Sequence, residues 1–263
     1  GAGVANHAEV ISVPENLTAK IPDNVDMIDA AYTTLGAIAM QGVRQADLNV
    51  GESCLVIGLG LIGQLSIQIL EASGVKVVGV DVDNEMVDFS KKNKFGLYLN
   101  RNQADIDDVI SSFSNGYGVD SVIITAGTSS EDPINFAGKV CRQRGRVVVV
   151  GAIPTGFQRE NYYMKELELR MSCSYGPGRY NADYENKGFD YPIGYVRWTE
   201  NRNMESFLDL INLKKINLSE LNTHNFSFEK AVDAYDMIMG KTETFIGISL
   251  EYCPEIDISK SIT

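Results

Sequence analysis

The sequence has few basic residues, few cysteines and no long uninterrupted hydrophobic run. Acidic side chains outnumber Lys and Arg by 35 to 23, which gives a formal net charge of −12 and a pI of about 4.7. Nucleic acids and anionic membrane surfaces select basic patches, so we expect neither as the main partner. At 44% hydrophobic and 22% charged residues, the remaining composition is that of an ordinary globular protein.

Membrane insertion and disulfide bonding are not expected either. The longest apolar-looking stretch, residues 54–70, is interrupted by Gln64, Ser66 and Gln68, whereas a membrane span needs about 20 predominantly apolar residues. No charged-then-apolar signal opens the chain. The cysteines are too scattered for a disulfide framework, which makes the cytoplasm the expected compartment. They stand at Cys54, Cys141, Cys173 and Cys253.

Strand and helix patterns alternate from about residue 50. Short apolar or β-branched runs predict strands at 54–57, 75–80, 97–99, 121–124 and 146–150. Apolar residues at helical spacing predict helices at 61–73, 83–94, 103–113 and 133–143. This order requires a parallel sheet with helices on both faces, so the expected fold class is α/β with a doubly wound sheet.

The alternation breaks after residue 153. A strand is expected at 167–174, and an aromatic, Gly- and Pro-rich insertion loop follows at 175–203. Loops of this length without secondary structure are usually functional or interfacial. Helices are expected at 204–211 and 228–239, and a last strand at 244–252.

A glycine-rich turn joins the first predicted strand to the first helix. The stretch Gly58-Leu59-Gly60-Leu61-Ile62-Gly63 fits the G-x-G-x-x-G pattern, which becomes informative in this strand-to-helix context. Gly58 permits the tight turn, Gly60 lets the backbone touch a pyrophosphate, and Gly63 lets the helix pack close to the sheet. The start of the helix, at Leu61 and Ile62, directs its free N–H groups and positive dipole end at the phosphates. Simple strand–helix packing is the weaker alternative.

An acidic residue ends the second predicted strand. Asp81 stands 18 residues beyond Gly63, close to the spacing of about 20 that places a carboxylate on the adenosine ribose. Its charge would repel a 2′-phosphate, and the next residues, Val82, Asp83 and Asn84, include no cation. NAD is therefore favoured over NADP.

Small residues end the fourth and fifth predicted strands. Ala126 and Gly127 follow one strand, and Gly151 and Ala152 follow the other. Because ligands lie outside the carboxyl ends of such strands, we expect these residues to flank the nicotinamide. The alternative is that these small residues only end the strands and begin ordinary loops. A methyltransferase is a further alternative for the whole pattern, although its sheet usually ends in an antiparallel hairpin that is not evident here.

With these motifs, the sequence resembles the medium-chain dehydrogenase/reductase superfamily, the zinc-type alcohol-dehydrogenase-like proteins. Residues 5–10 resemble the strand closing that family's catalytic domain, 29–31 lead into its interdomain helix, and 50–58 resemble its first cofactor strand. Residues 223–231 with Ala234-Tyr235 resemble the segment that returns to the catalytic domain. The resemblance implies a Rossmann domain with partial remnants of a GroES-like catalytic domain at both ends. Because residue 1 is Gly and the last residues are polar, we expect a piece of a longer protein, although processing could give the same ends.

The resemblance also implies a division of the chain. It comprises a catalytic-domain remnant at 1–30, the dinucleotide-binding Rossmann domain at 31–174, the insertion at 175–203, helices and a return strand at 204–252, and a linker or tail at 253–263. The insertion is similar to that of a subgroup fused to a glucose-fructose-oxidoreductase-like domain. The family's dimer contact corresponds to the strand at 167–174, so a homodimer is expected.

Zinc is not expected in this chain. Zinc-type members supply a Cys or Glu ligand before the interdomain helix, but residues 32–36, Tyr-Thr-Thr-Leu-Gly, include no usual zinc ligand. Thr33 and Thr34 would instead lie near the nicotinamide, with helix N-capping as the equal alternative.

The expected function is therefore NAD-dependent hydride transfer between the nicotinamide and an alcohol or carbonyl substrate. No acid/base residue is assigned, and this chain alone is expected to bind the cofactor but turn over poorly. A non-catalytic NAD-binding module is the remaining alternative besides the methyltransferase. Arg179 and Arg197 could bind an anionic substrate such as a nucleotide sugar, although packing of their loop against another domain is favoured.

Overall fold

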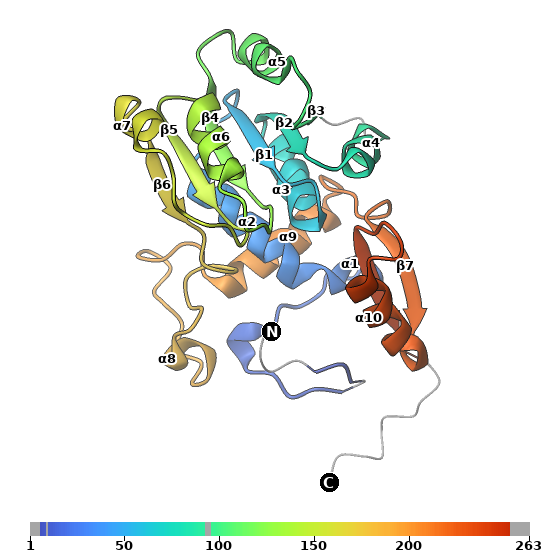
Figure 1. Cartoon of the computed structure of the whole chain (residues 1–263). Helices are drawn as coiled ribbons and strands as arrows, with labels where there is room; N and C mark the ends of the chain where they lie inside the picture. Colours follow the sequence, from blue (N-terminus) through green and yellow to red (C-terminus); the bar gives the residue numbers. More distant parts are fainter. Residues whose placement is uncertain (1–5, 9, 93–95, 253–263) are drawn as a thin grey trace.

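The core of the molecule is a sheet of six parallel strands (Figure 1). The structure is a computed structural model, and it describes residues 6–8, 10–92 and 96–252. The strands lie in the order β3-β2-β1-β4-β5-β6, which confirms the predicted α/β, doubly wound architecture. Their bounds are β1 Ser53–Ile57, β2 Lys76–Asp81, β3 Leu97–Asn100, β4 Val119–Ile124, β5 Cys141–Val149 and β6 Glu168–Met171.

The central strand β1 shows why the sheet is built from apolar runs. All five of its residues are buried, and Leu55 pairs with Val78 of β2 on one side and with Val122 of β4 on the other. A strand covered on both faces has no solvent-exposed side to accommodate polar residues, so its sequence is apolar from Cys54 to Ile57.

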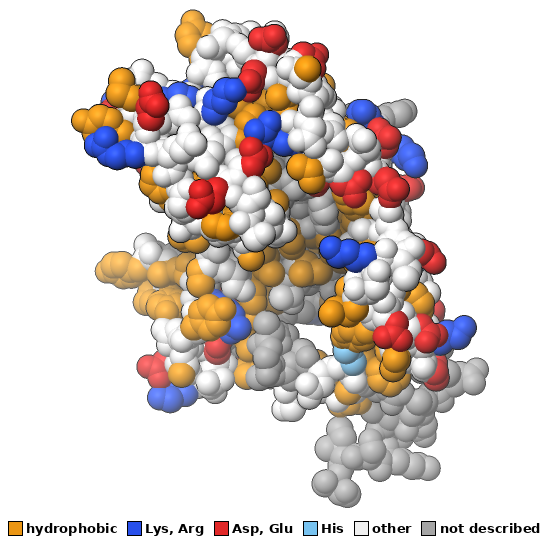
Figure 2. All heavy atoms as spheres, in the orientation of Figure 1, with side chains coloured by type: hydrophobic (Ala, Val, Ile, Leu, Met, Phe, Trp, Pro, Cys, Tyr) orange, Lys and Arg blue, Asp and Glu red, His pale blue; other side chains and the backbone are white. Residues whose placement is uncertain are grey.

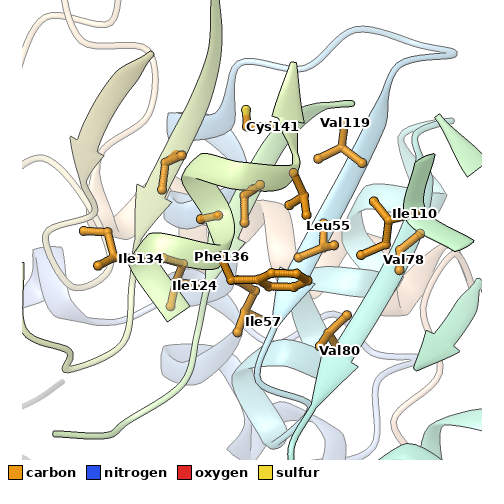
Figure 3. Close-up of a cluster of buried hydrophobic side chains, with 14 of the residues drawn as sticks. Leu55, Ile57, Val78, Val80, Ile110, Val119, Ile124, Ile134, Phe136 and Cys141 are labelled. Carbon is orange, nitrogen blue, oxygen red and sulfur yellow. The ribbon is translucent and has the colours of Figure 1, made fainter. Parts of the chain in front are cut away.

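Helices cover both faces of the sheet. One face packs on α5 and α6, where Ile110 and Phe136 meet Leu55, Ile57 and Val80 in the main core (Figure 3). On the other face, side chains of α2, α3 and α4 pack on the opposite sides of the same strands. The bounds are α2 Thr33–Ala46, α3 Leu61–Ala72, α4 Asn84–Lys92, α5 Ile106–Phe113, α6 Asp132–Val140 and α7 Arg159–Met164.

A further helix, α9 (Glu200–Asn212), lies behind α2. Its side chains Phe207, Leu208 and Ile211 are buried with Met40 of α2 and Ile69 of α3. The preceding insertion, which the sequence predicts as a long loop, contains only the short helix α8 (Ala182–Glu185) before α9.

A small second sheet lies away from the main one, at the lower right of Figure 1. Its two strands, β7 (Asn222–Ser227) and β8 (Gly247–Glu251), run parallel on either side of η2 (Phe228–Lys230) and α10 (Ala231–Gly240) along the chain. The Tyr32 hydroxyl donates to Asn222 Oδ1 at 2.6 Å and so ties this sheet to the region between α1 (Met27–Ala31) and α2. Strand β7 is not predicted from the sequence, because its exposed positions carry Thr, Asn and Ser.

Two predicted elements differ from the structure. The strand expected at 5–10 is wrong for the described residues 6–8 and 10, which form none, and only the 3-10 turn η1 (Glu15–Leu17) follows before α1. The helix expected at 133–143 ends at Val140. Lys165 Nζ donates to the carbonyl oxygens of Gly138, Lys139 and Cys141 at 2.6–3.0 Å and caps this end, after which the backbone is extended from Cys141.

The strand predicted at 167–174 is shorter in the structure, where β6 begins at Glu168 and ends at Met171. None of the helices described in residues 6–8, 10–92 and 96–252 combines the length and the hydrophobicity of a membrane span.

Replacement of Phe207 tests the packing of α9. Phe207→Ala removes a fully buried ring, so the free energy of unfolding is expected to fall by about 3–5 kcal/mol in urea denaturation. The control Leu213→Ala changes a side chain that is 63% exposed just past the same helix and should stay within about 0.5 kcal/mol of the parent. Equal losses in the two variants would contradict this packing.

Candidate functional site

The turn between β1 and α3 begins at Gly58 with a backbone conformation that favours glycine. Its φ is +100°, and its N–H donates to Val80 O of β2 at 2.8 Å. A Cβ at this position would stand 2.7 Å from Ala126 N, in the loop directly after β4. Gly58 therefore brings the turn against the carboxyl ends of both neighbouring strands.

Gly63 lets the first turn of α3 lie directly on this loop. A Cβ there would overlap the Gly58 carbonyl oxygen, so no larger residue fits without displacement of the backbone. The Thr125 hydroxyl donates to the same oxygen at 2.7 Å and fixes it from the β4 side. Strand, turn and helix are thus held together at one backbone carbonyl.

Gly60 is the exposed residue of the turn. It is the N-cap of α3, and nothing lies within 4 Å of the position that its Cβ would take. No side chain caps α3, and Leu61 and Ile62 of its first turn are half-buried. The open backbone and the positive helix end form a cradle that suits an anionic group.

The Asp81 carboxylate joins the tips of β1 and β2. Its Oδ2 accepts from Leu59 N at 2.7 Å, and its Oδ1 accepts from Asp83 N at 3.0 Å. Each carboxylate oxygen has a second lone pair, so both can still accept a ligand hydroxyl. Val82, the next residue, is 64% exposed and offers an apolar surface beside the carboxylate.

The tips of β4 and β5 lie against one another. A Cβ on Gly151 would overlap Ala126 O, and Gly151 N donates to Ile124 O at 2.9 Å. Gly127 and Ala152 are exposed beside them. The residues predicted from four separate stretches therefore share one edge of the sheet.

Thr33 and Thr34 stand in the first turn of α2, whose N-cap is Tyr32. The structure shows no side-chain cap bond at this helix start, and Thr33 Oγ1 instead donates to Ala30 O at 2.6 Å. The capping alternative is therefore wrong. Thr34 is half-buried, and its position near a nicotinamide stays a prediction.

A cavity of about 500 Å³ opens between the start of α4 and the loop after α10. Asp83, Glu85 and Glu243 contribute three carboxylates to its lining, and Lys241 is the one cationic lining residue. Figure 2 shows acidic side chains gathered on this side of the molecule. Sequence reasoning missed residues 241–245 here, because only the tertiary fold brings them to the end of β2.

The insertion is anchored by buried polar groups. Glu200 at the start of α9 is fully buried, and burial together with the neighbouring Glu185 carboxylate raises the pKa of Glu200 to about 7. Arg179 forms an ion pair with Glu185. The charge of Arg179 is therefore neutralised within the insertion. Of the two arginines predicted to bind an anion, only Arg197 still has no carboxylate partner among the described residues.

The described residues do not fit a zinc ion. No group of three or more His, Cys, Asp or Glu side chains within residues 6–8, 10–92 and 96–252 could hold a metal. His7 and His224 lie apart and hydrogen-bond to Tyr235 and Glu243, respectively. Cys54 and Cys141 are buried, whereas Cys173 is exposed.

Comparisons with known proteins agree with this geometry. The sequence model of a family described as zinc-binding dehydrogenase matches residues 62–186. A sorbitol dehydrogenase of Halalkalibacterium halodurans is 26% identical over 225 residues, which cover 83% of this chain and 57% of the relative. The alcohol dehydrogenase TADH of Thermus sp. ATN1 superposes with a TM-score of 0.71 at 19% identity, over 89% of this chain and 61% of that one.

The sequence and the fold of the chain are similar to those of medium-chain dehydrogenase/reductase proteins. An Escherichia coli alcohol dehydrogenase solved with its cofactor NADH shares the fold, with a TM-score of 0.68 at 20% identity over 88% of this chain and 61% of that one. The present chain spans 57–58% of the length of the first curated relatives in this superfamily. Those relatives are dehydrogenases and reductases of polyols and sugars by name.

Two glycine variants test the difference between the packed position Gly63 and the open position Gly60 in the β1–α3 turn. Gly63→Ala forces a methyl group into the Gly58 carbonyl, and we expect a loss of about 1–3 kcal/mol in the free energy of unfolding. Gly60→Ala adds a methyl group to open space and should leave that free energy within about 1 kcal/mol of the parent. Urea denaturation checks both, and a more destabilising Gly60→Ala would refute this geometry.

The buried Glu200 predicts a pH-dependent stability. Its pKa is raised to about 7 in the folded chain, above the ordinary 4.5, so its contribution is complete below about pH 4.5 and is lost as the pH rises toward 7. Glu200→Gln mimics the protonated form and should lessen this decline. Glu71, whose pKa burial also raises to about 7, contributes equally to both proteins. Parallel curves of unfolding free energy against pH for the two proteins would contradict the assignment.

Proposed function

We propose that this chain is the NAD(H)-binding part of an alcohol-dehydrogenase-like oxidoreductase that transfers a hydride between nicotinamide and an alcohol or carbonyl substrate. The observation that carries the proposal is the open backbone at Gly60, at the start of an uncapped helix and beside the Asp81 carboxylate. The bound cofactor would supply the hydride chemistry, and the protein would bind and orient it.

Each part of the edge would hold a different part of the dinucleotide. The N–H groups at Gly60, Leu61 and Ile62 would bind the pyrophosphate, because the helix end favours negative charge. Asp81 would accept both adenosine ribose hydroxyls through its free lone pairs, with Val82 packing against the adenosine. Gly58 and Gly63 would maintain the turn.

The other strand tips would flank the nicotinamide. Ala126, Gly127, Gly151 and Ala152 present small side chains and open backbone on the far side of the same edge. Thr34, at the start of α2, would approach from the adjoining helix. Small residues matter here because a planar ring and its ribose must lie against the backbone.

Charge favours NAD over NADP. The cavity beyond Asp81 carries the carboxylates of Asp83, Glu85 and Glu243 against the single cation of Lys241. A 2′-phosphate carries about two negative charges, and close like charges cost binding energy that a ribose hydroxyl does not. These carboxylates would add to the repulsion that Asp81 alone exerts on a 2′-phosphate.

The relatives support an alcohol or polyol substrate. They include a sorbitol dehydrogenase and a D-xylulose reductase, and an oxidoreductase of the same fold was solved with NADH. We propose the same chemistry here, with a GroES-like remnant outside the Rossmann domain 31–174 and no zinc within this chain. A homodimer through the open edge at β6 is part of the proposal, since one side of this strand is unpaired in the sheet. The fusion to a glucose-fructose-oxidoreductase-like domain and the cytoplasmic setting stay predictions.

The methyltransferase alternative is not favoured by the sheet. The six described strands of the main sheet are all parallel, with β6 parallel to β5, whereas that alternative expects an antiparallel hairpin at this end. A non-catalytic NAD-binding module has the same site and is separated from an enzyme only by activity of the full-length protein.

Asp81→Asn tests the proposed ribose contact. The amide keeps one acceptor oxygen for the turn but loses the charge, so NADH affinity should fall about 10–100-fold, in line with the loss of hydrogen bonds to a charged group. NADPH should lose less affinity, because the repulsion of its 2′-phosphate is also reduced. Fluorescence titration of NADH and NADPH measures both changes.

The control is Asp88→Asn, which removes an exposed carboxylate of α4 that pairs with Lys91 and should leave NADH affinity unchanged. An Asp81→Asn protein that binds NADH as tightly as the parent would refute the ribose contact. Calorimetric binding of S-adenosylmethionine in place of NADH would favour the methyltransferase.

A further inference from the structure

Two arginines stack on the single tryptophan of the chain. The guanidinium carbon of Arg44 lies 3.3 Å from the centroid of the Trp198 ring, and that of Arg197 lies 3.8 Å from it. Arg44 belongs to the last turns of α2, whereas Arg197 and Trp198 belong to the insertion, just before α9. The two positive charges are therefore within about 7 Å of one another, a distance at which like charges repel appreciably.

This pair has no acidic partner among the described residues. No carboxylate oxygen in the described part of the chain lies within 4.0 Å of either guanidinium group. Arg159 is the third arginine without a carboxylate partner among the described residues. The remaining arginines all form ion pairs. They are Arg101, Arg142, Arg144, Arg146, Arg170, Arg179 and Arg202. The chain carries a net charge of −12, and yet no carboxylate of the described residues neutralises this pair.

Arg44 is held in place rather than free to move away. Its Nε donates to Asn203 Oδ1 at 2.8 Å and its Nη2 to Ser206 Oγ at 3.2 Å. Asn203 is fully buried and itself donates to Tyr175 O at 2.9 Å. Burial and repulsion by Arg197 lower the pKa of Arg44 to about 10, so it still carries its charge at neutral pH. The fixed guanidinium leaves Nη1 available for a ligand.

The pair lies beside the last two strands of the sheet. Asp47, three residues beyond Arg44, accepts from Arg146 of β5 through its backbone oxygen at 3.1 Å. Gln45, the residue after Arg44, accepts from Arg170 of β6 through its backbone oxygen at 2.9 Å. The arginine pair therefore lies beside β5 and β6, whereas the glycine-rich turn and Asp81 follow β1 and β2.

We propose that Arg44, Trp198 and Arg197 form a binding site for the phosphate group of a small ligand. A phosphate carries close to two negative charges at neutral pH and several acceptor oxygens, so it can neutralise two guanidinium groups at once. A carboxylate carries one charge and matches the fork of one arginine. Arg197 is exposed and Trp198 and Arg44 are half-buried, which leaves the ligand a route from solvent to a partly desolvated site.

Trp198 provides a direct signal for the test, because no other tryptophan contributes to the fluorescence. The chain is titrated with inorganic phosphate, with glucose 6-phosphate and with malonate, each at a constant ionic strength set by sodium chloride. We expect a saturable change in tryptophan emission with phosphate at millimolar or lower concentration. A tighter response to glucose 6-phosphate would support a phosphorylated metabolite, and an equal response would support free phosphate.

Arg197→Gln should weaken phosphate binding at least tenfold, with an unchanged circular dichroism spectrum because the side chain is exposed. Arg159→Gln is the matched control, since Arg159 is also unpaired and stacks on an aromatic ring, that of Tyr163, with its guanidinium carbon 3.8 Å from the ring centroid. It should bind phosphate as the parent does. Absence of a saturable response, an equal affinity for malonate, or equal losses in both variants would overturn the proposal.

This proposal stands independently of the proposed NAD(H) site. Arg197→Gln should bind NADH as tightly as the parent, because Arg197 is not among the residues proposed to bind the dinucleotide. Failure of the parent chain to bind NADH would refute the proposed function and leave the phosphate titration unaffected.

Discussion

The contact between the first turn of α3 and the Gly58 carbonyl is the constraint on which the rest of the structure depends. Gly63 approaches that oxygen more closely than any side chain would allow, and the Thr125 hydroxyl fixes it from β4 at 2.7 Å. With the helix seated in this way, its amino end must point across the carboxyl edge of the sheet. Gly58 and Gly63 hold the turn against the strands, and Gly60 between them stays exposed at this edge, with no atom within 4 Å of the position of its Cβ.

Asp81 shapes the same edge and, under the proposed function, would also make it selective for NAD. Its carboxylate holds the β1–α3 turn through Leu59 N and the start of α4 through Asp83 N. The acidic residues that follow it, with Glu243 from the distant loop, create a negative field beside the ribose position. A neutral ribose is compatible with this field, whereas a 2′-phosphate would be repelled. One side chain therefore supports the turn and, under the proposed function, would also select the cofactor.

The sequence predicts the sheet and this edge because both rely on local signals. A buried strand, three spaced glycines, an amphipathic helix and an acid at the next strand end are adjacent in the chain, and the structure brings them together as expected. The features that the sequence does not reveal depend on distant partners. Lys165 ends α6 by binding its last carbonyls, residues 241–245 form a wall of the cavity, and Arg44 meets Trp198 more than 150 residues away. Strand β7 is missed for a similar reason, since its polar residues are exposed and only pairing with β8 defines it.

A crystal structure of the chain grown with NADH would test the central claim most directly. The account predicts pyrophosphate density over the Gly60 and Leu61 N–H groups, the adenosine ribose on Asp81, and the nicotinamide between the tips of β4 and β5. Density for the dinucleotide elsewhere on the chain, or an empty edge at saturating NADH with these residues exposed to solvent, would contradict it.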